Sequence, residues 1–445
     1  MDIATLIPQF GGALWTFAAF VVALSVIVFV HEYGHYIVGR WSGIRAEVFS
    51  IGFGPVLLKR TDRRGTQWQV AALPFGGYVK FLGDASAASD KASDTYDQLD
   101  EDTKRHTMHG APLWARAATV AAGPVFNFIL SILVFAAILL WQGTPREPVQ
   151  IGTLKPMPEA AQGLLPGDTI LAVSGTETPD YQGFFDVVRE MPVTESVRYD
   201  IDRAGEQVAV EGPYPFPPLV EGLQAGSAAM DVGIETGDVI TAIDGTPLIA
   251  FKQLQEAVGE SDGKPLALDI WRDGETLEFV LAPRRVDLPT ADGGFETRWL
   301  IGMTGGLMFT PATETPGVLE SLQYGVDQTG FIIQSSLSGL WHMVTGAISA
   351  CNLRGPIGIA ETSGAAASQG VDSFIWFIAV LSTAVGMLNL FPIPVLDGGH
   401  LVFHAYEALA GRPPSDKALR LLMGVGLSLM LALMAFALTN DLFCP

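Results

Sequence analysis

Residues 13–35 read ALWTFAAFVVALSVIVFV followed directly by HEYGH. The apolar part, residues 13–30, carries no charge and suits a helix that crosses a bilayer core of roughly 30 Å. It lacks the basic leader and the small-residue cleavage site of a secretory signal, so we expect it to stay in the mature protein. Two histidines and a glutamate therefore end a predicted membrane span, where ionisable side chains are costly and functional by default.

The pentad His31-Glu32-Tyr33-Gly34-His35 has the spacing of a zinc site. Positions i and i+4 of a helix share a face, so both imidazoles can bind one tetrahedral Zn²⁺ with Glu32 beside the open position. Zinc would acidify its water and polarise a carbonyl, and Glu32 would pass the proton to a leaving amine. The pattern predicts a zinc peptidase. The alternative, an interfacial histidine pair without metal, is disfavoured by the apolar setting.

The composition indicates a membrane protein, since mean hydropathy is +0.33 and only 16% of residues are charged. Three more stretches are uncharged over a spanning length, namely residues 117–141, 373–396 and 421–440. We therefore expect four transmembrane helices.

Lysine and arginine gather in the loops after the first span, before the second, and between the third and fourth. They are Arg40, Arg45, Lys59, Arg60, Arg63, Arg64, Lys104, Arg105, Arg116, Arg412, Lys417 and Arg420. By the positive-inside rule these loops are cytoplasmic. Residues 145–327 hold 30 of the 47 acidic residues and should be solvated on the other side, the periplasm of a bacterium. The net charge of −21 excludes nucleic acid as a partner, because a phosphate backbone requires a basic surface.

A catalytic zinc needs a third protein ligand, and Asp397 is the leading candidate. It ends the third predicted span after Pro392 and Pro394, which should break the helix and leave polar backbone at membrane depth. His400 and His404 form a competing pair at i and i+4, followed by Glu407. We favour Asp397, because a solvated helix face past the apolar stretch explains the competing pair.

A further uncharged segment, residues 328–353, has polar residues at spacings of three and four. They are Ser335, Ser338, His342, Thr345 and Ser349. The stripe predicts an amphipathic helix in the membrane interface rather than a fifth span. A fifth span would also separate Asp397 from His31 across the membrane.

The acidic region contains an internal repeat. Residues 163–175 and 233–245 share the pattern Gly-apolar-x-x-Gly-Asp-x-Ile-x-x-apolar-x-Gly at a constant offset of 70 residues. The pattern predicts a tight turn, a short strand and another turn, hence two copies of one small domain. It resembles the PDZ signature. PDZ domains bind extended peptides or chain termini by strand addition; the alternative is a pair of spacers or size filters.

Three separated motifs together resemble the site-2 protease family over essentially the whole chain. They are His31-Glu-Tyr-Gly-His35, Gly123-Pro-Val-Phe-Asn127 and Asn389-x-x-Pro392-x-x-x-x-Asp397-Gly. The resemblance implies that Asp397 completes the zinc site. It also implies that Asn389 and Pro392 help to hold the unwound substrate.

The resemblance further implies a membrane-dipping β-hairpin around Gly52, Phe53 and Gly54, whose edge pairs with the substrate. The residues agree, since 51–58 and 67–80 are strand-like runs separated by the turn sequence Asp62-Arg-Arg-Gly65. Ordinary loop geometry is the alternative explanation of the two glycines. Strand pairing suits the chemistry, because a helix must unwind before its carbonyls can be attacked.

The sequence thus predicts a multi-span α-helical membrane protein with a membrane-associated β-hairpin and two periplasmic PDZ-like α+β domains. The expected limits are 1–144 and 373–445 for the two membrane parts, 145–214 and 215–290 for the PDZ-like domains, and 291–372 for a periplasmic connector that carries the interfacial helix. We expect an inner-membrane enzyme with one Zn²⁺ near the cytoplasmic side and with the lipid bilayer around it.

The resemblance implies regulated proteolysis of single-span substrates such as anti-sigma factors, and extends to leftover signal peptides. A scaffold with a structural metal site is a rival, but structural zinc sites are closed by four ligands and do not use a neighbouring base such as Glu32. A metal transporter is another rival, yet its polar residues would line a path, and here they gather at one point.

Two features have no assigned role. Cys351 and Cys444 are too few for a disulfide framework and are not spaced as a metal-binding pair. The acidic loop 84–102 is low in apolar residues and is expected to be mobile.

Overall fold

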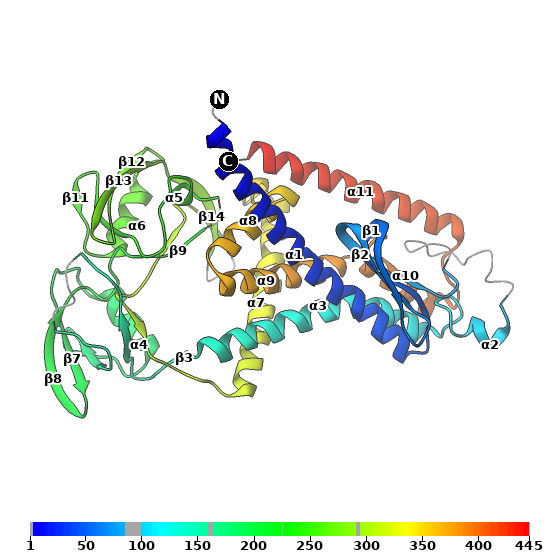
Figure 1. The fold of residues 1–445 in the computed structure, drawn as a ribbon, viewed down its shortest axis with the longest axis horizontal. Helices are drawn as coiled ribbons and strands as arrows, with labels where there is room; N and C mark the ends of the chain where they lie inside the picture. The colour runs from blue at the N-terminus through cyan, green and yellow to red at the C-terminus, as the bar shows by residue number, and fades with distance from the viewer. Residues whose placement is uncertain (1–2, 85–98, 159–162, 225, 291–293, 445) are drawn as a thin grey trace. The chain divides into compact units, whose positions relative to one another are not determined.

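A computed structural model of the chain describes residues 3–84, 99–158, 163–224, 226–290 and 294–444. The expected mobile loop 84–102 lies mostly outside these residues. The chain forms two compact units (Figure 1). The membrane unit comprises Met1–Ile138, Ser321–Trp341 and Ala350–Pro445, and the lobe unit comprises Leu139–Glu320 and His342–Ser349.

Four helices of the described chain are long and apolar enough to cross a membrane. They are α1 (Ile3–Trp41), α3 (Leu113–Gln142), α9 (Val371–Asn389) and α11 (Asp416–Phe443). The four predicted spans fall on them, but the third was predicted to continue to residue 396. Helix α9 ends earlier, because Pro392 and Pro394 cannot continue the hydrogen-bonded ladder. Shorter helices are α2 (Glu101–Lys104), α8 (Pro356–Ser368) and α10 (Asp397–Ala410).

Helix α7 (Val318–Val344) replaces the predicted helix 328–353. The prediction was wrong in extent, since Gly346, with φ +78°, turns the chain just beyond the end of the helix and leaves Thr345 and Ser349 outside it. The buried residues of α7 are Ser321, Gly325 and Thr329, which recur every fourth position. Gly325 lies against the Ile132 backbone of α3, the close contact that small residues permit between membrane helices.

The two cysteines, which had no assigned role, form a disulfide bond. Cys351 lies in a short 3₁₀ turn (Ala350–Asn352) and joins Cys444, 93 residues later, at the end of α11. Side chains of α11 reinforce this junction. Asn440 donates to the Ala350 carbonyl at 2.8 Å, and the Asp441 carboxylate accepts the Gly355 amide at 2.7 Å. The end of α11 thereby caps the start of α8, whose first amides lack helical partners.

The predicted hairpin consists of β1 (Ala46–Thr61) and β2 (Gln67–Phe81). Both strands bend, so the hairpin becomes a sheet of four segments in the order 77–81, 46–51, 67–73, 56–61. Gly52 and Gly54 both have φ +84°, and a Cβ on Gly52 would lie 2.7 Å from the Leu73 carbonyl oxygen. The bend at these positions therefore requires glycine.

The lobe unit contains two lobes with the same sheet order. The first lobe has the sheet β6-β5-β7-β8 and helix α4; the second has the sheet β11-β10-β12-β13 and helix α6. First-lobe elements are β4 (Ile151–Leu154), β5 (Thr169–Val173), β6 (Thr176–Glu177), α4 (Tyr181–Glu190), β7 (Val197–Arg203) and β8 (Glu206–Gly212). Second-lobe elements are β9 (Val220–Leu223), α5 (Ala228–Asp231), β10 (Val239–Ile243), β11 (Thr246–Pro247), α6 (Phe251–Glu260), β12 (Leu266–Arg272) and β13 (Glu275–Leu281). The hairpin β14 (Arg284–Pro289) and β15 (Phe295–Leu300) follows.

The Gly-Asp pair of the sequence repeat has one structural role in both lobes. Asp168 is buried, accepts the Leu165 amide and binds the Arg203 guanidinium through two nitrogens. Asp238 makes the equivalent contacts to Glu235 and Arg272. These bonds stabilise the charged form of each arginine and raise its pKa.

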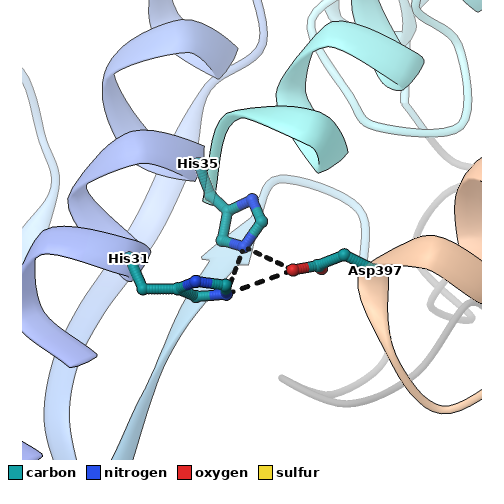
Figure 2. A group of neighbouring side chains, drawn as sticks. All are labelled: His31, His35 and Asp397. Carbon is teal, nitrogen blue, oxygen red and sulfur yellow. Dashed lines mark hydrogen bonds and ion pairs between the residues drawn. The ribbon is translucent and has the colours of Figure 1, made fainter. Parts of the chain in front are cut away.

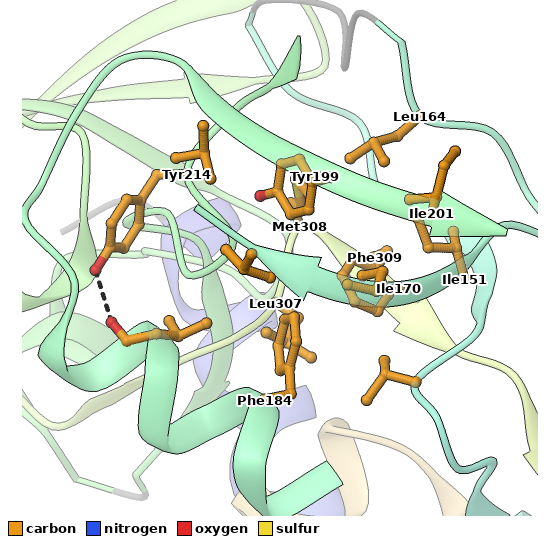
Figure 3. Close-up of a cluster of buried hydrophobic side chains, with 14 of the residues drawn as sticks. Ile151, Leu164, Ile170, Phe184, Tyr199, Ile201, Tyr214, Leu307, Met308 and Phe309 are labelled. Carbon is orange, nitrogen blue, oxygen red and sulfur yellow. Dashed lines mark hydrogen bonds between the residues drawn. The ribbon is translucent and has the colours of Figure 1, made fainter. Parts of the chain in front are cut away.

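One segment, residues 303–311, completes both lobes. Its first part, β16 (Met303–Gly305), pairs with β9 of the second lobe, and β17 (Phe309–Pro311) pairs with β4 of the first. Leu307 and Met308 lie between these two strands, and Phe309 begins β17. All three side chains enter the buried core of the first lobe (Figure 3). Next along the chain, β18 (Thr313–Glu314) pairs with β3 (Thr144–Pro145). The second lobe is thus inserted into the first, beyond the predicted limit at residue 290.

Candidate metal centre

Three side chains from two helices of the membrane unit meet at one point (Figure 2). His31 and His35 lie one turn apart on α1, and Asp397 is the first residue of α10. The Nε2 atoms of the two imidazoles are 3.2 Å apart. Asp397 Oδ2 lies 3.1 Å from Nε2 of His31 and 3.6 Å from Nε2 of His35. Among the described residues, this is the group of histidine and carboxylate side chains that could hold a metal ion.

These distances fit a tetrahedral zinc site. Nitrogen and oxygen ligands about 2.1 Å from Zn²⁺ would stand about 3.4 Å from one another, and the three measured separations bracket that value. Asp397 Oδ2 is also buried without a hydrogen-bond partner in the described chain. A buried carboxylate oxygen is costly unless it is paired or binds a metal, so the donor set suits a divalent cation. Two imidazoles and one carboxylate leave one position open.

The chain break after α9 brings Asp397 to this point. Residues 390–396 leave the helix, and α10 then starts at Asp397. The two glycines that follow allow a tight fold, since a Cβ on Gly398 would overlap the Leu390 and Phe391 carbonyls and one on Gly399 would overlap that of Ile393. Backbone packing of this kind fixes the direction in which the Asp397 side chain leaves the helix.

Gly123 of α3 provides the space for both imidazoles. A Cβ at this position would overlap the His35 ring, lying 2.5 Å from Cε1, and would lie 2.8 Å from Cε1 of His31. Gly34, between the histidines on α1, packs in turn against the Ala122 backbone. The two glycines let α1 and α3 approach closely enough for α3 to form the back of the site.

Helix α3 also contacts Nδ1 of each imidazole, the ring nitrogen that faces away from the three converging donor atoms. His35 Nδ1 lies 2.8 Å from the Thr119 carbonyl oxygen, which fixes Nδ1 as the protonated nitrogen and leaves Nε2 free for a metal. His31 Nδ1 lies 3.2 Å from the side-chain amide of buried Asn127, whose oxygen has no partner within the described residues; with that oxygen turned toward the ring, Nδ1–H donates to it and Nε2 is free for a metal. Such outer contacts set the tautomer and the ring direction of metal-binding histidines.

Replacing Asn127 with leucine is expected to weaken metal binding about 10- to 100-fold, because His31 loses the partner that orients its ring. The measurement is competition for zinc against a fluorescent chelator. Ser131→Ala is the matched control, since Ser131 is buried one turn further on α3 and donates to the backbone carbonyls of Asn127 and Ala379 rather than to an imidazole. Equal zinc affinity in the Asn127 and Ser131 variants would contradict a role for Asn127 in orienting His31.

Glu32, between the two histidines, faces the hairpin sheet. Its carboxylate interacts electrostatically with His35, His31 and Asp397, and it accepts a hydrogen bond from the Val79 backbone. Gly77 of β2 lies against it, since a Cβ there would be 3.2 Å from Glu32 Cγ. Segment 77–81 at the edge of the sheet therefore runs beside the candidate base.

The residues predicted to bind substrate lie at the end of α9, in the break before α10 and at the hairpin bend. Asn389 is the last residue of α9 and donates to the Val385 carbonyl, while Pro392 is exposed in the break before α10. At the hairpin bend, the exposed Phe53 ring stacks on Tyr78, and Gly54 is exposed, whereas Gly52 is buried. No contact recorded within the described parts of the chain joins these five residues to the three donors, and their roles stay a prediction.

The competing ligand candidates on α10 are His400, His404 and Glu407. Glu407 receives two hydrogen bonds from Arg116 of α3, so it is half-buried in an ion pair and not on a solvated face as expected. Burial, together with the Arg116 charge, lowers the pKa of His404 to about 4, so its ring is neutral at pH 7. His400 and His404 do not join the group of potential metal donors found in the described chain.

Comparison with known proteins agrees with this geometry. The chain matches the family model described as Peptidase family M50 over residues 19–433. A "Putative zinc metalloprotease" of Agrobacterium fabrum is 35% identical over 431 residues, covering 95% of this chain and 94% of that protein. The "Regulator of sigma-E protease RseP" of Salmonella typhimurium is 35% identical over 459 residues, covering 96% of this chain and 98% of that protein.

Proposed function

This chain belongs to peptidase family M50, the site-2 protease family of membrane metalloproteases, and from that premise we propose that it cuts transmembrane segments of single-span proteins with one zinc ion. The proposed ligands are His31, His35 and Asp397. The observation that carries the proposal is the convergence of their three donor atoms at tetrahedral spacing beside Glu32.

In the proposed mechanism, a side chain of the protein transfers one proton, and other side chains hold the site in place. A zinc ion held by His31, His35 and Asp397 would supply a Lewis acid for water and for the scissile carbonyl. Glu32 takes the proton of that water and delivers it to the leaving amine. The Thr119 and Asn127 contacts keep both imidazoles oriented while this happens.

Substrate presentation requires local unwinding, because a helix hides its carbonyls in its own hydrogen bonds. The freed backbone then needs partners, which the hairpin sheet can offer at an edge. Its location beside Glu32 supports this role. We assign Gly52, Phe53 and Gly54 to shaping the bend of the sheet, and Asn389 and Pro392 to holding the unwound segment.

The surface of the sheet supports its association with the membrane. Large apolar side chains are exposed along both strands near the bend, namely Phe53, Val56, Leu57, Leu58, Val70, Leu73 and Phe75. Exposed apolar patches of this kind mark contact with a partner or with lipid. The four basic residues at the opposite end, Lys59, Arg60, Arg63 and Arg64, suit the anionic headgroups of the cytoplasmic leaflet.

Two independent observations support the proposed topology. Arg412, Lys417 and Arg420 precede or begin α11, which favours a cytoplasmic start for this helix. The disulfide at the other end of α11 suits an oxidising compartment such as the bacterial periplasm. Both agree with a protein of the bacterial inner membrane whose acidic lobes are periplasmic and whose metal site lies near the cytoplasmic side.

We further propose that the two lobes are PDZ-like domains that bind peptides or the periplasmic ends of substrates. The repeated sheet order and the repeated Asp-Arg pair support two copies of one domain. The limits 145–214 and 215–290 are extended by residues 303–311, and the membrane parts remain 1–144 and 373–445 with a connector between 291 and 372. The name of the Salmonella relative, "Regulator of sigma-E protease RseP", refers to sigma-E. We therefore propose anti-sigma factors as substrates and leftover signal peptides as a second class.

The test is metal analysis and cleavage of a single-span model substrate by the purified full chain in detergent. We expect about one zinc per chain, loss of cleavage on chelation and recovery on adding zinc back. Asp397→Asn should hold far less zinc and cleave nothing, whereas Asp416→Asn, at an exposed helix start, should match wild type. A metal-free wild type that still cleaves would refute the zinc site.

A further inference from the structure

A bidentate ion pair ties α10 to α3 at a distance from the metal donors. Arg116 Nη1 lies 3.1 Å from Glu407 Oε2, and Nη2 lies 2.6 Å from Oε1. The side chains are 17% and 18% exposed, and the partners are 291 residues apart in sequence. A paired geometry of this kind fixes orientation as well as distance, so the contact constrains how the two helices face each other.

Packing of Gly398 and Gly399 holds the first turn of α10, and in the described part of the chain α10 continues into no other helix at either end. Irregular residues 390–396 precede it, and Gly411, in the left-handed conformation with φ +68°, ends it. Each residue of a helix turns its side chain by about 100°, so a modest rotation of α10 would aim Asp397 away from the imidazoles.

The ion pair and the metal centre contact α10 at its two ends. Glu407 is ten residues after Asp397, about 15 Å along the axis, and Arg116 is seven residues before Gly123, about 10 Å along α3. Thus α3 backs both histidines at Gly123 and binds the far end of α10 at Arg116. His404, one turn before Glu407, is neutral at pH 7 and does not replace Arg116 as the cationic partner.

We propose that Arg116 and Glu407 are positioning residues, which hold α10 at the rotation that points Asp397 toward His31 and His35. The inference rests on the proposed metal site and deepens it. Neither side chain touches the donors, so the pair acts through the helix. Loss of one partner leaves a half-buried charge unpaired and frees α10 to turn.

The experiment compares Glu407→Gln, Arg116→Met and the exchanged pair Arg116→Glu with Glu407→Arg in the full chain. Zinc affinity is measured by competition with a chelator, and kcat and KM are measured on a single-span substrate. We expect each single variant to bind zinc about 10-fold more weakly, the lower end of the loss that follows removal of a direct contact to a metal ligand, because this pair acts through the helix. We expect kcat to fall with KM nearly unchanged, and the exchanged pair to recover most of the affinity.

Glu101→Gln is the matched control, since it removes an exposed ion pair with Lys104 in the same unit. A zinc-binding wild type whose Glu407→Gln variant matches Glu101→Gln in affinity would overturn the positioning role alone. A folded exchanged pair as weak as the single variants would overturn it as well. If the single variants do not fold, the zinc affinities of Arg116→Lys and of the exchanged pair test the positioning role instead. A wild type without zinc would overturn both this inference and the proposed function.

Discussion

Replacing Glu32 with glutamine is expected to slow substrate cleavage by about 10²- to 10⁴-fold, the range that a positioned general base contributes, while zinc stays bound. Glutamine keeps the shape of the side chain and its contact with the Val79 backbone, but it cannot take a proton. The three metal donors are untouched by the change. Cleavage rates and zinc content of the purified variant measure the two effects separately.

Glu361→Gln is the matched control, because Glu361 is an exposed glutamate on α8 of the same unit. It should cleave at the wild-type rate. If Glu32→Gln cleaves as fast as Glu361→Gln, another group moves the proton and the assignment of Glu32 is wrong. If Glu32→Gln loses its zinc, Glu32 supports the metal site rather than the proton transfer.

Replacing Gly123 with alanine is expected to abolish zinc binding and, with it, cleavage. The added methyl group would occupy the space of the His35 ring and press on His31. Both imidazoles would have to leave their positions, or α3 would have to move away from α1, and either shift breaks the tetrahedral spacing. A misplacement of only about 1 Å can cost about 10²-fold in rate, and here two ligands shift together.

The control is Gly424→Ala on α11, another glycine within a predicted span. A Cβ there meets no atom within 4 Å, so the substitution should leave zinc content and cleavage unchanged. Alanine also favours helix at both positions, so the two variants differ mainly in what the methyl group contacts. A Gly123→Ala protein with wild-type zinc content would show that α3 does not form the back of the site.

The sequence alone predicted the spans and the candidate metal donors, because uncharged length and the spacing of His31 and His35 are local signals. Uncharged length predicts a membrane helix, and the i, i+4 histidines predict a shared face. Asp397 could be chosen because the prolines before it break the third span. The family match confirms the resemblance to the site-2 protease family, while the roles of individual site residues stay predictions.

Other features depend on contacts between distant residues, which spacing does not encode. Gly123 and Asn127 stand within a quoted motif, yet nothing in the motif tells which imidazole each one meets. The disulfide joins residues 93 positions apart, and a count of cysteines does not show that their backbones meet. The polar stripe around Ser335 marked one face of a helix, but Gly346 sets where α7 ends, and the face buried on α3 is marked by Gly325.

The shared segment 303–311 has a consequence for biosynthesis. The second lobe is contiguous in sequence, so its strands are all available once β16 has been made and exported. The first lobe begins earlier but lacks Leu307, Met308 and Phe309 until that point. As the chain emerges from the ribosome and crosses the membrane, the second lobe can therefore complete its fold first. The first lobe keeps an incomplete core until its last strand, β17, has been made. On the proposed topology, export stalled at residue 300 would leave the first lobe, which is made earlier, exposed to periplasmic proteases.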